Sequence, residues 1–291
     1  MRVTPTQLLS GMVLIVLVAR PAVTVTGACF QHDENFTVLA EDEMLAADVL
    51  ASANRFRQRV ANEWLGVELP PSVGETIIHV TLSDEEDRGL TWAIDSPNRS
   101  MHKIWLTTSR DRANGSTLQH EIAHIVLATR YPQRLPAWAD EGIAGTYDEQ
   151  DRINLRRQII HWYADTGNWP SLESVFQMPT IINTDKKAYS VAASVTEFLL
   201  TRGDRPTFVE FAAAGQQAGW DRALQDFYRL ESVAALQQAW QAWASGIETS
   251  NSELGHIRVE QGNRETDPSP ECSIPGVPGR PQQDTRASHG H

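Results

Sequence analysis

The residues of this chain best suited to chemistry are His120, Glu121 and His124, which form an H-E-x-x-H segment. On a helix, two histidines at positions i and i+4 can bind one metal ion, and the glutamate between them can serve as a general base. At about 100° per residue, His124 lies roughly 40° and Glu121 roughly 100° from His120. The opposite face holds a mainly apolar stripe: Leu118, Ile122, Ile125, Val126 and Thr129. The pattern therefore predicts a helix that packs its back on the core and presents both imidazoles and the carboxylate to a cleft.

Two imidazoles do not complete a catalytic zinc site, which usually has three protein ligands and leaves a fourth position for water. A metzincin-type histidine is excluded, because Leu127 and Arg130 stand where that class has glycine and histidine. The remaining common solution is a glutamate on a following helix. Segment 138–144, Trp-Ala-Asp-Glu-Gly-Ile-Ala, offers Glu141.

A Trp-x-x-Glu-Gly-x-Ala segment shortly after H-E-x-x-H resembles the gluzincin arrangement of zinc metallopeptidases. The layout over about residues 41–245 resembles peptidase MA-like domains. The resemblance implies Zn²⁺ as the cofactor, Glu141 as its third protein ligand, and Tyr189 as a donor to the developing oxyanion. The alternative for Tyr189 is a tyrosine that only packs on its helix.

The metal chemistry defines the remaining roles. Zinc activates a water molecule and polarises a carbonyl group, and Glu121 would take the proton of the attacking water. Asp140 either orients a ligand imidazole or is a surface carboxylate. Because no glycine-rich exopeptidase motif lies upstream, aminopeptidase activity is not implied and we expect an endopeptidase.

Hydrophobic periodicity indicates the elements that position these residues. A helix is expected over about 41–65, strands over 76–82 and 102–107, and a period of about 3.6 from residue 116 onward. Further helical patterns cover 151–163, 184–201, 206–213, 220–230 and 232–243. The predicted fold is α+β: a small N-terminal sheet with the H-E-x-x-H helix, followed by a mostly helical C-terminal lobe.

The strand 102–107 directly precedes the metal-binding helix, and the gluzincin resemblance makes it the edge of the sheet above the cleft. An exposed edge lets an extended peptide pair with it through backbone hydrogen bonds. His79 and His102 lie inside predicted strands, and we expect them to be structural.

The chain ends suggest processing and a tail. Residues 1–28 have the pattern of a signal peptide, which predicts a secreted or cell-envelope protein without a membrane span in the mature chain. The expected organisation is a signal peptide (1–28), an N-terminal α+β lobe with the zinc motif (29–150), a helical lobe (151–248) and a disordered Pro-rich tail (249–291). Cys29 could carry a lipid anchor or pair with Cys272, and the two possibilities exclude each other.

The formal net charge of −12, from 37 acidic and 25 basic residues, disfavours nucleic acid as a partner. The expected partner is a peptide or protein substrate. The leading hypothesis is an exported zinc peptidase, and the alternative is a non-catalytic zinc-binding module for protein binding or assembly in the cell envelope. The intact Glu121 favours the peptidase, since a binding module could lose this residue and keep its ligands.

Overall fold

The structure is a computed structural model that describes residues 29–71, 75–96, 99–182 and 184–260. The predicted signal peptide, Cys272 and residues 261–291 of the predicted tail lie outside the described residues. The chain forms two compact units that divide between Ile247 and Glu248. The predicted N-terminal and helical lobes both belong to the first unit, and helix α9 (Val233–Glu260) extends past the point where the tail was expected to begin.

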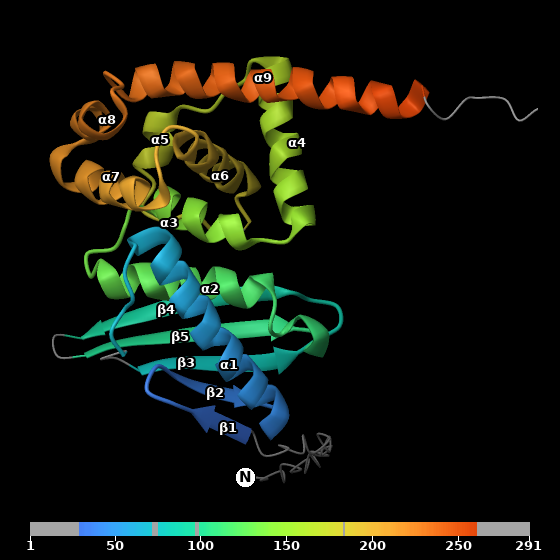
Figure 1. Ribbon diagram of the computed structural model, residues 1–291, viewed down its shortest axis with the longest axis vertical. Coiled ribbons are helices and arrows are strands. Elements are labelled where there is room, and N and C mark those ends of the chain that lie inside the picture. The colour runs from blue at the N-terminus through green and yellow to red at the C-terminus, as the bar shows by residue number, and fades with distance from the viewer. Residues whose placement is uncertain (1–28, 72–74, 97–98, 183, 261–291) are drawn as a thin grey trace, which may run out of the picture. The chain divides into compact units, whose positions relative to one another are not determined.

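Within the described residues, five strands form one mixed sheet in the order β1-β2-β3-β5-β4 (Figure 1). The strands are β1 (Cys29–His32), β2 (Phe36–Ala40), β3 (Glu75–Leu82), β4 (Arg88–Ser96) and β5 (Arg99–Thr108). The inner pairs β2/β3 and β3/β5 are parallel, whereas β1/β2 and β4/β5 are antiparallel. The sheet and the helices that follow it confirm the predicted α+β class.

The strand expected at the edge of the sheet is an interior strand, which corrects that prediction. Lys103 of β5 pairs with Ile77 of β3 on one side and with Trp92 of β4 on the other. The edge beside the cleft is therefore β4. The expectation failed because segment 88–96 was not recognised as a strand, so the partner that covers β5 was missing.

One face of the sheet packs against helices α1 (Glu43–Val60) and α2 (Ser116–Arg130) (Figure 1). Alternate strand residues, such as Val38, Ile78 and Ile104, are fully buried beneath them. The side chain of Asp42 caps α1 by accepting a hydrogen bond from the Leu45 N–H. A π-helical turn, η1 (Ala61–Leu65), then ends α1. This packing fixes the position of α2 and of the histidines on it.

After α2, the described part of the first unit is mostly helical. Its helices are α3 (Ala137–Ala144), α4 (Gln150–Thr166), α5 (Leu172–Phe176), α6 (Lys186–Leu200), α7 (Arg205–Ala218), α8 (Trp220–Tyr228) and the first part of α9, with short 3₁₀ turns η2 (Arg110–Arg112) and η3 (Gly145–Tyr147). Trp138 of α3 is fully buried and stacks on Phe176 of α5, with ring centroids 4.1 Å apart. This aromatic contact anchors the helix that carries Glu141. Among the described residues, no helix combines the length and the apolar character needed to cross a bilayer.

Candidate metal centre

Helix α2 presents His120 and His124 as the sequence predicted. Its back is in the core, where Leu118, Ile122 and Val126 are fully buried. One helical turn separates the two histidines, and their ring centroids lie 5.0 Å apart. Both imidazoles line a cleft of about 1000 Å³.

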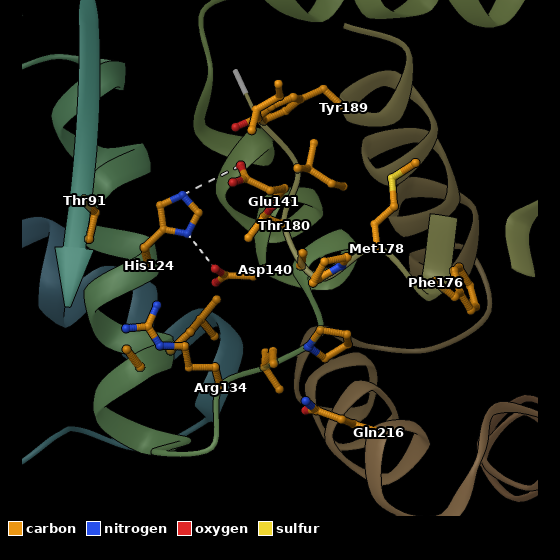
Figure 2. Close-up of a pocket in the computed structure, with 18 of the residues that line it drawn as sticks. Thr91, His124, Arg134, Asp140, Glu141, Phe176, Met178, Thr180, Tyr189 and Gln216 are labelled. Atoms are coloured by element: carbon orange, nitrogen blue, oxygen red, sulfur yellow. Dashed lines mark hydrogen bonds and ion pairs between the residues drawn. The ribbon is translucent and has the colours of Figure 1, made fainter. Parts of the chain in front are cut away.

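Helix α3 brings Glu141 to the two histidines. The Oε2 atom of Glu141 lies 3.7 Å from His120 Nε2. It lies 3.8 Å from His124 Nε2, as the dashed line in Figure 2 marks. The three side chains offer ligand atoms that all lie within 4.8 Å of one another, so they could hold a metal ion. Tetrahedral zinc with ligands at about 2.1 Å would place its ligand atoms about 3.4 Å apart, which is close to the 3.7 and 3.8 Å from Glu141 Oε2 to the two imidazoles.

The surroundings of the Glu141 carboxylate also suit a cation. Oε2 is buried, and no hydrogen-bond donor among the described residues reaches it. A buried carboxylate oxygen without a partner is costly, and a metal ion at the centre of the cluster would supply that partner.

Gly142 allows α3 to approach α6 closely. A Cβ atom at this position would lie 2.1 Å from Thr196 Oγ1 and 3.0 Å from the Ala192 carbonyl oxygen. The second of these contacts is with backbone, which cannot move aside without shifting the helix. The Glu-Gly pair of the motif therefore combines a ligand with the only residue type that fits this close contact.

Carboxylates orient both imidazoles. His120 Nδ1 lies 3.0 Å from Asp148 Oδ1, and His124 Nδ1 lies 2.9 Å from Asp140 Oδ2. Donation from each Nδ1–H leaves the Nε2 lone pairs directed toward Glu141. Asp140 thus contacts the imidazole of a candidate ligand, which agrees with the first of its two predicted roles, the orientation of a ligand imidazole. Asp148 was not predicted, since no local motif marks it.

Asp148 is itself held in place by cations. Its side chain is 3% exposed, and it accepts a hydrogen bond from Arg156, while Arg152 Nη1 lies 3.8 Å from Oδ1. Burial alone would raise the pKa of Asp148, but His120 and Arg156 outweigh it and hold the pKa well below its usual range. Asp148 is therefore ionised at any ordinary pH and can accept a hydrogen bond from the His120 Nδ1–H.

The electrostatics of the metal-free cluster favour bound protons. Burial works to lower the pKa of His124, but the charges of Asp140 and Glu141 raise it to about 10. Burial also disfavours the charged form of His120, yet Asp148 raises the pKa of this histidine. Burial raises the pKa of Glu141 against the opposing effect of both histidines. A cluster that holds positive charge this strongly can also accept a divalent cation in place of the protons.

Glu121 lies beside the three-residue cluster and is not a member of it. It is 5% exposed, lines the same cleft, and accepts a hydrogen bond from the Thr91 hydroxyl of β4. A Cβ atom at Gly89 would lie 2.3 Å from Glu121 Oε1, so the carboxylate rests directly against the β4 backbone. Gly89 and Thr91 were missed from the sequence together with their strand.

Tyr189 comes from the first turn of α6 and lines the cleft on the opposite side from Thr91 (Figure 2). Burial raises its pKa strongly, and the charge of Glu141 and a hydrogen bond to that residue add to the effect. The phenol therefore stays protonated and can donate a hydrogen bond. The structure brings Tyr189 to the cluster.

Two histidines outside the motif occupy different environments. His102, expected to be structural, is buried and also contributes to the lining of the cleft. His79 lies on β3 and is half-buried, outside the residues that line the cleft.

No family model, curated protein or solved structure matches this chain.

Proposed function

We propose that this chain is an exported zinc-dependent peptidase of the gluzincin type, in which His120, His124 and Glu141 hold the metal. The observation that carries the proposal is the separation of Glu121 from the three candidate ligands. The three ligands meet at one point, while Glu121 is fixed beside them by Thr91 and Gly89 in the same open cleft. A purely structural site would have no need for this fourth, separately held carboxylate.

When bound, zinc lowers the pKa of water and polarises a carbonyl group. Glu121 accepts the proton of the attacking water and passes it to the leaving amine of the peptide bond. The Thr91 hydroxyl donates to Oε2 of Glu121 and holds the carboxylate in place for this role. Tyr189 remains protonated and donates a hydrogen bond to the developing oxyanion.

The edge strand β4 is the proposed site of substrate alignment. Gly89, Leu90 and Thr91 of this strand line the cleft, and among the described strands β4 pairs with β5 alone. An extended peptide can therefore add to the sheet beside Glu121 through backbone hydrogen bonds. The signal-peptide pattern of residues 1–28 supports export. Cys29, at the start of β1, either carries a lipid anchor or pairs with Cys272.

The test is the substitution Glu121→Gln, which removes the base and keeps the size of the side chain. The variant is expected to retain one zinc ion and its thermal stability, while peptide hydrolysis falls by about 10²–10⁴-fold. Glu197→Gln is the matched control, because Glu197 lies on α6 in an exposed pair with Arg157. A peptide-library assay with and without a chelator would measure turnover for all three proteins.

Two results would contradict the proposal. Wild-type rates in Glu121→Gln would remove Glu121 from the chemistry. A zinc-loaded wild type that cleaves no peptide in a broad library would favour the alternative hypothesis, a non-catalytic zinc-binding module.

A further inference from the structure

Arg152, in the first turn of α4, joins two parts of the molecule that lie far apart in the sequence. It donates a hydrogen bond from Nη2 to the backbone carbonyl oxygen of Asp87, and its Nη1 lies 3.8 Å from Asp148 Oδ1. Asp87 directly precedes strand β4, and Asp148 is the carboxylate that contacts His120. One guanidinium therefore contacts both the start of the edge strand and the partner of a candidate metal ligand.

The carboxylate of Asp87 ties the same point of the chain to helix α2. The hydroxyl of Thr117, in the first turn of α2, donates to Asp87 Oδ2 at 3.0 Å, and Arg112 Nη1 lies 3.7 Å from the same oxygen. The Asp87 side chain is 10% exposed, so water screens these contacts little. The start of β4 is thus held through its carbonyl group by α4 and through its carboxylate by α2.

The first residues of β4 are the ones that support the proposed base. Gly89 and Thr91 follow Asp87 by two and four residues, and the Thr91 hydroxyl donates to Glu121. The same stretch is the edge at which we propose that a peptide aligns. A shift at Asp87 would therefore displace the support of Glu121 and the substrate together, relative to the metal ligands on α2 and α3.

We propose that Arg152 is a positioning residue that fixes the start of β4 relative to His120. The planar guanidinium carries several donors in a rigid fork, so it can hold a carbonyl group and a carboxylate in one geometry. Arg152 lies outside the residues that line the cleft, so it acts through Asp87 and Asp148 and not on the substrate. This inference rests on the proposed peptidase function and adds to it the residue that aligns the edge strand with the metal centre.

The first test compares kinetic constants of the zinc-loaded full chain. Arg152→Ala is expected to lower kcat by about tenfold and to change KM by less than about twofold, because a slightly displaced strand still pairs with a peptide but aligns its scissile bond poorly. The melting temperature should fall by less than about 4 °C, since the Arg152 side chain is 40% exposed. Arg152→Lys should recover part of kcat, because it keeps the charge without the planar fork.

The matched control is Arg157→Ala on the same helix. The side chain of Arg157 is 50% exposed and pairs with Glu197, which is 49% exposed. Neither residue lines the cleft. This control removes an arginine of similar exposure from α4, so kcat and KM should stay at their wild-type values.

Two further measurements follow the two ends of the Arg152 contacts without relying on turnover. In zinc-loaded protein with ¹⁵N-labelled histidine, the Nδ1–H signal of His120 should shift in Arg152→Ala, whereas that of His124, whose partner is Asp140, should not. Amide hydrogen exchange over residues 88–91 should become about tenfold faster, because the start of β4 loses its contact with α4. Arg157→Ala should change neither.

Each outcome decides for or against the positioning role. An unchanged kcat in Arg152→Ala, or an equal loss in Arg157→Ala, would overturn it. A loss of kcat that lower zinc content or a larger fall in melting temperature accounts for would overturn it too, as would a change at one end of the contacts only. In a chain that cleaves no peptide, changes at both ends would leave the positioning role intact and refute the peptidase, whereas no change at either end would refute both.

Discussion

The two carboxylates that orient the histidines allow a matched prediction, because they make the same contact in different environments. Asp148 is 3% exposed and contacts His120 and Arg156, whereas Asp140 is 32% exposed and contacts His124. We compare Asp148→Asn with Asp140→Asn. Each substitution removes the charge and keeps the shape of the side chain.

The expected loss of zinc affinity is similar for the two variants. Each imidazole loses a charged acceptor at Nδ1, and such losses typically weaken metal binding by about 10–100-fold. By contrast, the expected loss of stability differs. Asparagine at 148 places its amide beside the partly buried Arg156, and breaking a buried charge pair costs about 3–5 kcal/mol.

We expect a value near the lower end for Asp148→Asn, since Arg156 keeps its hydrogen bond to the Gly145 carbonyl oxygen. At Asp140, solvent screens the interaction, and the cost should stay below about 1 kcal/mol. The loss of stability expected for Asp148→Asn is a large part of the total of about 5–15 kcal/mol that is typical of a domain.

The measurements are urea denaturation of the metal-free proteins and zinc titration against a chromophoric chelator. Metal-free protein is used for stability because bound zinc would itself stabilise the fold. Equal stability of the two variants would refute the argument from burial. Unchanged zinc affinity in both would refute the orienting role of these carboxylates.

Two further predictions concern the metal and the base. Zinc affinity should rise by about tenfold per pH unit for each proton displaced. The pKa of metal-free His124 is raised to about 10, so zinc must displace its proton at neutral pH. A zinc affinity that does not change between about pH 6 and 9 would contradict this prediction. Gly89→Ala should lower turnover without changing the zinc content, because the new Cβ would overlap Glu121 Oε1 at 2.3 Å. Gly167→Ala is the control and should leave both unchanged, because no atom of the described residues lies within 4 Å of a Cβ added there. Equal effects of the two variants on peptide cleavage would contradict the packing argument.

The parts of the site that were predicted from sequence have a local basis. Helical periodicity alone places His120 and His124 on one face of α2, and the structure has them there. The prediction of Glu141 as the third ligand depended on the Glu-Gly segment. The close packing of Gly142 against α6 explains why glycine follows the glutamate. Local spacing was enough in these cases because each feature lies within one or two neighbouring helices.

The missed residues depend on contacts between distant segments. Asp148 becomes part of the site only because the short helix α3 and the turn after it fold back on α2. Strand β4 was missed because Arg88, Gly89 and Asp95 interrupt its apolar pattern, while Leu90 and Trp92 are exposed at 60% and 63%. An edge strand of this kind is recognised by its partner β5, which local propensity cannot reveal. The wrong edge assignment followed directly from that omission.

The central claim is that His120, His124 and Glu141 form one zinc site, and zinc stoichiometry tests it most directly. The purified chain should bind about one zinc ion, and Glu141→Ala should lose most of it at equal free zinc, because two imidazoles cannot complete the site. Glu197→Ala, at an exposed carboxylate on α6, is the control and should bind as the wild type does. A wild-type chain that binds no zinc, or a Glu141→Ala variant with unchanged stoichiometry and affinity, would contradict the account.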